Sequence, residues 1–221
     1  MVLGTYYDGV EVCREERVVF ARFLVPHRVV STCRVAGGLR DDLEYLYNHQ
    51  GCEPAGHGHD SLALADPVAY RSRVAQSYGL PPERCATLGT AANMNCVAIA
   101  ADRFRDVEVV AVCTGGVETN AGRVGDPASM YEWAGRFQMV SDGYQPAHGT
   151  INTVLLISQE VIPGAMVRAV MTATEAKTAV LQELAVNSRY SDGLATGTGT
   201  DQIAVACRLT GTSEPAEACR A

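Results

Sequence analysis

The chain has 221 residues and a mass of 23.5 kDa, with 47% hydrophobic and 19% charged residues. This composition supplies a full apolar core and excludes disorder as a description of the whole chain. The net charge is −7 and no basic run occurs, so binding along nucleic-acid phosphates is not expected. No apolar stretch approaches the roughly 20 residues that span a bilayer, and residues 1–8 lack a secretory signal pattern. We therefore expect a soluble cytoplasmic protein with neither nucleic acid nor membrane as a partner.

Eight cysteines are spread along the chain without any CxxC pair. Several lie inside apolar stretches, as Cys113 and Cys207 do, where a thiol behaves as a small hydrophobe. We expect reduced cysteines in the core and no disulfide framework.

The first predicted elements are two strands. Residues 16–23 and 27–35 alternate apolar and polar positions on either side of Pro26, which also allows them to pair as a hairpin. Asp66 followed by Pro67 predicts the start of a helix that ends near Gly79. Residues 85–92 predict a short strand that runs into a helix over 94–103.

The second half alternates strands and helices. The apolar runs 107–114 and 150–158 predict buried strands, and residues 202–209 predict a final strand before a frayed tail at 210–221. A short helix is predicted around 128–137, and a long one from Pro163 to about Val186. The order predicts an α/β (α+β) fold, a layered sandwich in which helices cover a mixed β-sheet. No linker divides the chain, so we expect a single domain over residues 1–221.

The long helix carries the only lysine of the chain, Lys177. At about 100° per residue, this lysine falls on an apolar stripe. The stripe consists of Met166, Val170, Ala173, Val180 and Leu184. A buried ammonium needs a partner, so Lys177 is either a structural ion pair, a side chain that reaches past its neighbours to solvent, or an amine with a role in catalysis. Glu175 lies on the opposite face, where we weigh a solvated position against a substrate contact.

Alternating glycine and threonine precede the last predicted strand. The segment consists of Thr196, Gly197, Thr198, Gly199 and Thr200, and Asp201 follows it. Such a segment exposes backbone N–H groups and hydroxyls, which suits an oxyanion hole or a cradle for a polar ligand, although it also occurs as an ordinary tight connection. We expect Asp201 to pair with Lys177.

Two further segments carry polar residues beside predicted strands. Thr150 and Asn152 share one face where the strand over 150–158 begins, so they could bind an amide or satisfy the end of the sheet. Asn120 lies in a loop with several glycines that follows the strand over 107–114. No GxGxxG pattern is present, so a dinucleotide site is not expected.

Residues 49–60 concentrate histidine, cysteine and acidic side chains. The candidate ligands are His49, Cys52, His57 and His59, which suit zinc. Their spacing matches none of the common zinc motifs, so we expect a polar substrate lid here and no required metal or cofactor.

Three motifs in series resemble the adenosylcobinamide amidohydrolase family of corrinoid salvage. They are residues 149–152 (GTIN), 172–178 (TATEAKT) and 195–201 (ATGTGTD), and residues 116–126 and 36–39 are also similar to that family. The resemblance covers about residues 28–207. It implies hydrolysis of the amide that joins a corrin propionate to aminopropanol, which converts adenosylcobinamide into adenosylcobyric acid.

The residues themselves suggest how such an amide would be cut. Lys177 and Asp201 would handle protons, residues 196–200 would supply oxyanion donors, and Asn152 would orient the amide. Asn120 would contact the amides of the corrin.

Three alternatives to this mechanism remain open. Thr150 could be a nucleophile released by self-cleavage after Gly149, or the histidine and cysteine cluster could hold a catalytic metal. The protein could also be a corrinoid carrier or sensor without hydrolytic activity. The sequence leaves the oligomeric state, including a homo-oligomer, undetermined.

Overall fold

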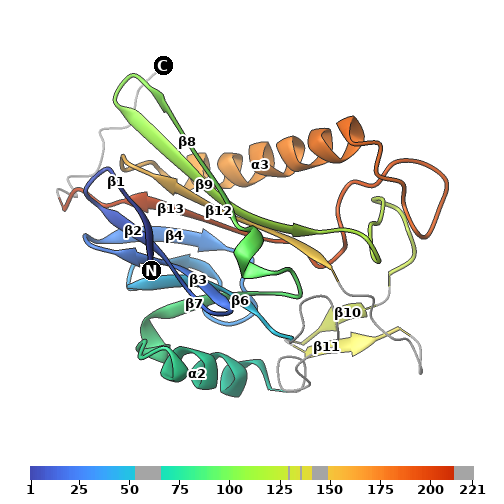
Figure 1. Cartoon of the computed structure of the whole chain (residues 1–221), viewed down its shortest axis with the longest axis horizontal. Coiled ribbons are helices and arrows are strands. Elements are labelled where there is room, and N and C mark those ends of the chain that lie inside the picture. The colour runs from blue at the N-terminus through green and yellow to red at the C-terminus, as the bar shows by residue number, and fades with distance from the viewer. Residues whose placement is uncertain (53–65, 129, 135, 141–148, 212–221) are drawn as a thin grey trace.

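Two β-sheets stacked face to face form the centre of the computed structural model, and one helix covers the outer face of each sheet (Figure 1). The structure describes the chain except residues 53–65, 129, 135, 141–148 and 212–221. The four layers therefore follow the order helix, sheet, sheet, helix, which confirms the predicted mixed α+β sandwich.

The first sheet has five strands in the order β1-β2-β3-β6-β7. They are β1 (Val2–Tyr6), β2 (Val10–Glu15), β3 (Val18–Phe23), β6 (Tyr45–Gln50) and β7 (Cys85–Thr90). All neighbours are antiparallel except β6 and β7, which run parallel. Helix α2 (Pro67–Ser77) lies between these two in the chain, and its Tyr70, Val74 and Ala75 pack on the outer face of the sheet.

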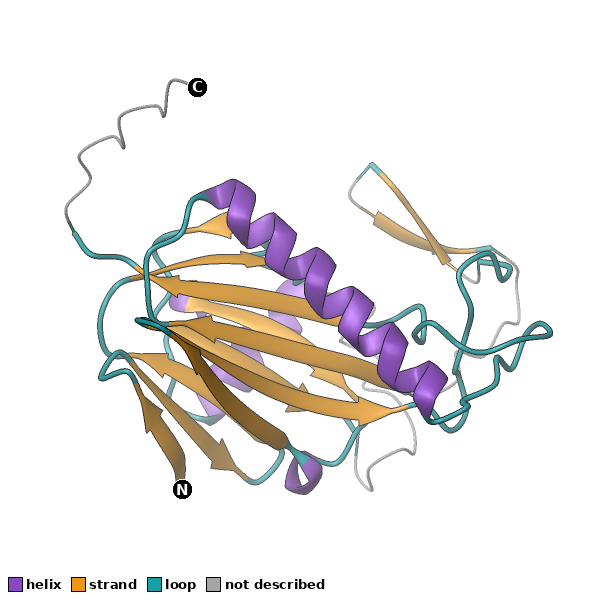
Figure 2. Cartoon of the chain, turned by 90° about the horizontal axis from the view of Figure 1, so that it is seen from above, coloured by secondary structure: helices purple, strands orange, loops and turns teal. Residues whose placement is uncertain are grey.

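The second sheet has six strands in the order β5-β4-β13-β12-β9-β8. They are β4 (His27–Ser31), β5 (Gly38–Arg40), β8 (Ala98–Phe104), β9 (Val107–Gly116), β12 (Thr150–Ile157) and β13 (Gln202–Arg208). Only β12 and β13 run parallel, and helix α3 (Pro163–Glu183) connects them across the outer face (Figure 2). Met166 anchors α3 on Ile157, Val205 and Cys207.

Apolar residues from both sheets fill the space between them. The fully buried strand residues among them include Val10, Val12, Val29, Leu46, Leu88, Val110 and Leu156. Their burial from alternate strand positions explains why the two sheets stay together. The described cysteines are all free, and no described helix is long and apolar enough to cross a membrane.

The predicted strands and the two long helices are confirmed, but the hairpin over residues 16–35 is wrong. Strand β3 pairs with β2 and β6, whereas β4 pairs with β13 and β5 in the other sheet. The segment between them crosses from one sheet to the other. Leu24 donates its N–H to Gly9 of the first sheet, and the Pro26 carbonyl accepts from Leu209 after β13.

Two predicted helices are also wrong. Residues 94–103 form one 3₁₀ turn, Met94–Cys96, followed by the edge strand β8, which pairs with β9 along its whole length. The helix predicted over 128–137 is replaced, in the described residues, by a separate hairpin of β10 (Met130–Trp133) and β11 (Arg136–Met139). In both cases strand pairing overrides a weak local helical preference.

The predicted apolar stripe of α3 is correct in its first half only. Met166 is fully buried, whereas Val180 and Leu184 are 51% and 69% exposed, and Leu181 is buried instead. Beyond Ala173 the helix packs against the loop before β13, where Thr178 donates a hydrogen bond to the Thr196 carbonyl. In this half of the helix the buried side therefore carries Leu181 in place of Val180.

Candidate active site

The candidate site lies at the edge of the six-stranded sheet where β12 and β13 begin. Because these strands are parallel, they start at the same edge, and Asn152 pairs with Gln202 in register. Ile151 and Asp201 therefore meet, although 50 residues separate them along the chain. Two loops close the same edge, because Gly122 and Gly197 form a backbone bridge between residues 116–126 and 186–201.

Asp201 is the centre of this site. Its Oδ2 lies 2.5 Å from Lys177 Nζ and also accepts the Thr198 N–H at 3.1 Å. Its Oδ1 accepts the Ile151 N–H at 2.8 Å and the Thr198 hydroxyl at 2.5 Å. The side chains of Lys177 and Asp201 are 19% and 15% exposed, so this is a largely buried ion pair whose carboxylate accepts four hydrogen bonds. The expected pairing of Lys177 with Asp201 is present in the structure.

Gly197 is required by the closeness of this ion pair. A Cβ at this position would lie 2.8 Å from Lys177 Nζ and still closer to Asp201 Oδ2. Any larger residue would therefore displace the ammonium or the carboxylate. The glycine in the Gly–Thr segment allows the backbone to approach the charged pair.

A second group of contacts surrounds the peptide bond between Gly149 and Thr150. The Gly149 carbonyl accepts hydrogen bonds from Asn120 Nδ2 at 2.6 Å and from the Thr200 hydroxyl at 2.7 Å. The Thr150 hydroxyl donates to the Thr200 carbonyl at 2.7 Å. Thr198 joins the two groups, since its hydroxyl contacts both Asp201 and Thr200 Oγ1. Asn120 and Thr150 are buried, whereas Thr200 is exposed, so the group opens to solvent on one side.

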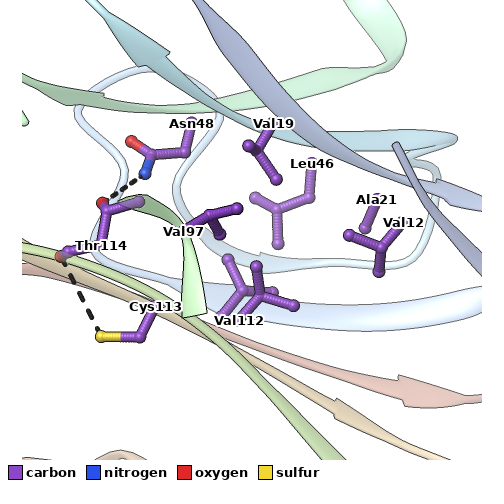
Figure 3. Close-up of a pocket in the computed structure, with 10 residues that line it drawn as sticks. Val12, Val19, Ala21, Leu46, Asn48, Val97, Val112, Cys113 and Thr114 are labelled. Carbon is purple, nitrogen blue, oxygen red and sulfur yellow. Dashed lines mark hydrogen bonds between the residues drawn. The ribbon is translucent and has the colours of Figure 1, made fainter. Parts of the chain in front are cut away.

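Asn152 lies deeper, between the two sheets. Its amide donates to Asn48 Oδ1 at 2.8 Å and to the Gly89 carbonyl at 3.0 Å, and Asn48 donates in turn to Thr114 at 2.8 Å. The adjoining cavity, of about 10 Å³, has room for about one water molecule (Figure 3). Asn152 therefore supports the interior behind the site, and the structure does not place it beside Lys177.

Asn48 is a residue that the sequence analysis did not single out. The signal available was a run of three polar residues, 48–50, at the end of a strand, all of them buried. A buried amide on one sheet needs a partner on the other, and here Asn152 and Thr114 supply it.

The other predicted binding residues have mixed outcomes. The N–H groups of Thr196 and Gly197 donate to the Gly122 carbonyl, and that of Thr198 donates to Asp201, so these three donors are used within the protein. The Thr196 hydroxyl accepts the Val124 N–H. Gly199 is exposed, with a φ of 74° that favours glycine. Glu175 is exposed on the far side of α3 and joins none of these contacts.

The histidine and cysteine cluster is only partly described. His49 is buried and bonds Tyr70 Oη at 2.5 Å, and Cys52 is buried beside the Ala91 carbonyl. His57 and His59 lie outside the described residues, as does most of the predicted lid. Within the described part of the chain, no group of three His, Cys, Asp or Glu side chains is arranged to hold a metal.

The geometry brings together the three motifs that suggested a family, and comparison with known proteins agrees. The model of the family described as adenosylcobinamide amidohydrolase matches residues 3–220. The chain belongs to this family. It is also 39% identical over 141 residues to an uncharacterized protein of Methanocaldococcus jannaschii, MJ1613. That match covers 62% of this chain and 55% of the relative, so the chain spans about half the length of the curated protein it matches.

Proposed function

We propose that this protein hydrolyses the amide bond between the corrin propionate and aminopropanol of adenosylcobinamide, and so releases adenosylcobyric acid. The observation that carries the proposal is the convergence of three family-like motifs on one carboxylate. Residues 149–152, 172–178 and 195–201 are far apart in sequence, yet Asp201 receives hydrogen bonds from all three. Membership of the family over residues 3–220 supports the same reaction.

Amide hydrolysis needs a nucleophile, donors for the oxyanion and a proton for the leaving amine. Around Gly149, Asn120 Nδ2 and the Thr200 hydroxyl already point at a carbonyl oxygen, which is the geometry that an oxyanion requires. We assign the oxyanion donors to this pair, in place of the N–H groups of residues 196–198. Lys177 and Asp201 lie within the same hydrogen-bonded group and would hold and transfer protons.

We place the substrate at the end of the molecule that carries the candidate site, because the cavity between the sheets, of about 10 Å³, is too small for a corrin. The β10–β11 hairpin lies at the same end of the molecule as the loops 116–126 and 186–201 (Figures 1 and 2). Tyr131 and Trp133 share one face of the hairpin and are 46% and 71% exposed. We assign this aromatic face to the flat, largely apolar corrin ring.

Release of aminopropanol tests the reaction. The protein is incubated with adenosylcobinamide, and free aminopropanol is quantified against time. Turnover is expected from the natural chain and from Thr153→Val, which changes a threonine of β12 that contacts Cys113 and not the site. Tight corrinoid binding without release would refute hydrolysis and favour the carrier or sensor.

Binding is followed separately through Trp133, the only tryptophan of the chain. Corrinoid bound against the hairpin should quench its fluorescence. Trp133→Ala should raise KM by about 10-fold and leave kcat close to the natural value, because the aromatic face binds the ring and not the reacting amide. An unchanged KM would exclude the hairpin as the corrin site.

A further inference from the structure

The peptide bond between Gly149 and Thr150 is held in an unusual way. Its carbonyl oxygen accepts two side-chain hydrogen bonds, from Asn120 Nδ2 and the Thr200 hydroxyl, at 2.6 and 2.7 Å. Two short donors on one carbonyl withdraw electron density from its carbon and would stabilise a negative charge on its oxygen. This is the arrangement of an oxyanion hole, and here it acts on the protein's own backbone.

A nucleophile adjoins the polarised carbonyl. The Thr150 hydroxyl belongs to the residue that follows the peptide bond, so its attack on the Gly149 carbon would close a five-membered ring. Thr150 is 3% exposed, and its hydroxyl donates a hydrogen bond to the Thr200 carbonyl at 2.7 Å. Thr200 therefore binds both reacting groups, through its carbonyl and its hydroxyl.

Only glycine fits before this threonine. A Cβ on Gly149 would lie 2.5 Å from the Gly116 carbonyl oxygen and closer still to Asn120 Oδ1. Asn120 Oδ1 is itself buried and has no hydrogen-bond partner in the described structure. The absence of a side chain on Gly149 thus lets Asn120 come close enough to bind the carbonyl.

We propose that the chain cuts itself between Gly149 and Thr150, and that Thr150 then becomes an N-terminal nucleophile. Thr150 Oγ1 bonds to the Gly149 carbonyl carbon, the hydroxyl proton passes through water to the amide nitrogen, and the C–N bond breaks. The product is an ester of Gly149 on Thr150, with a free α-amine. Water then hydrolyses the ester, which restores the hydroxyl and leaves a Gly149 carboxylate, so the whole change consumes one water molecule.

The cut would assemble the parts that hydrolysis of a second amide needs. The new α-amine of Thr150 can take the proton of its own hydroxyl, as in other threonine nucleophiles. Asn120 Nδ2 and the Thr200 hydroxyl would then bind the substrate carbonyl in the place that Gly149 occupied. Asp201 holds the Ile151 N–H and so keeps the new terminus in position. This second step rests on the proposed amidase function, whereas the cut itself does not.

Intact-mass spectrometry tests the cut. The natural chain, incubated at neutral pH, should change from one species of 23.5 kDa into residues 1–149 and 150–221, with a combined mass larger by one water molecule. Sequencing of the smaller piece should begin at Thr150. Thr150→Ser should still cut and Thr150→Ala should not. Asn120→Ala should slow the cut by about 100-fold, and Thr153→Val should leave it unchanged.

Folding of each variant is checked by circular dichroism, and aminopropanol release is measured on the same samples. A folded natural chain that stays whole overturns the self-cleavage, whether or not it releases aminopropanol. A cut that persists in Thr150→Ala also overturns it, because a contaminating protease is then responsible. A cut at Thr150 without aminopropanol release supports the self-cleavage and refutes the proposed reaction instead.

Discussion

The ion pair of Lys177 and Asp201 allows the sharpest test of the site, because its two members are bound very differently. Asp201 has four donors, of which Lys177 is one and Thr198 and Ile151 supply the rest. Lys177→Met keeps the length of the side chain and removes one charged hydrogen bond. We expect a loss of about 2 kcal/mol in the free energy of unfolding, since a charged hydrogen bond contributes roughly 1.5–3 kcal/mol and three donors remain on the carboxylate.

Asp201→Asn should cost more. An amide has one acceptor oxygen, so its NH₂ group must face either Lys177 and the Thr198 N–H or the Ile151 N–H and the Thr198 hydroxyl. In either orientation the NH₂ group faces other donors, and the largely buried Lys177 ammonium loses its counter-ion. We expect the free energy of unfolding to fall by about 4 kcal/mol. The order of the two losses, and not only their size, is therefore predicted.

Urea unfolding followed by circular dichroism measures both losses. Every chain carries Thr150→Ala, so that all remain whole and share one connectivity. The double variant should lose about 1–2 kcal/mol less than the sum of the single losses, because the two groups contact each other. A Lys177→Met loss equal to or larger than that of Asp201→Asn would refute this account of the site.

Turnover is measured with Thr150 present, where Lys177→Met should reduce kcat by about 100-fold or more. Val180→Ala, an exposed change one turn further along the same helix, is the control and should leave kcat unchanged. Natural turnover by Lys177→Met would remove the lysine from the mechanism.

Three further predictions concern the rest of the fold. Met166→Ala should lower the free energy of unfolding by about 2–5 kcal/mol, whereas Val180→Ala should change it by less than about 0.5 kcal/mol, as urea unfolding would show. Burial lowers the pKa of His27 below 6.5, so below that pH the unfolded chain takes up a proton that the folded chain binds more weakly. The free energy of unfolding should therefore fall as the pH drops from 7 to 5, and His27→Phe should make this fall smaller. Burial raises the pKa of the Cys33 thiol to about 11, so iodoacetamide at pH 8 should modify the exposed Cys96 and spare Cys33, as peptide mapping would detect.

The sequence predicted most of the second sheet because its signals are local. The apolar runs that became β9 and β12 are each long enough to be strands covered on both faces, and Pro163 starts α3 where expected. The errors share one physical cause. Residues 98–104 form a strand by pairing with β9, and residues 130–133 pair with 136–139. Such pairing leaves no periodic pattern in a short exposed segment.

The site was predicted in part for a similar reason. Lys177 and Asp201 could be paired from the sequence because each was the unusual charge near a predicted apolar face or strand end. The sequence could not predict which acceptors the backbone N–H groups of residues 196–198 would bind, because this depends on the loop that packs against them. Here Gly122 accepts the N–H groups of residues 196–197, which leaves side chains to bind the Gly149 carbonyl.

The six-stranded sheet explains why a cut before Thr150 would not dismantle the molecule. Residues 150–221 contribute β12 and β13, which lie side by side between β9 and β4 of the preceding piece. β12 pairs with β9 along its whole length, and β13 pairs with β4 from Ala204 to Arg208. The cut falls where β12 begins, so every one of these ladders survives it.

The two pieces should therefore stay together without a covalent bond. Size-exclusion chromatography of the cut protein at neutral pH should give one peak that contains both, at the volume of the uncut Thr150→Ala chain. Denaturant should separate them, because the ladders and the packing of Met166 on β13 then no longer hold them. Separate elution in native buffer would show that these contacts do not hold the pieces together. The oxyanion site would then be broken, because Asn120 and Thr200 lie on opposite sides of the cut.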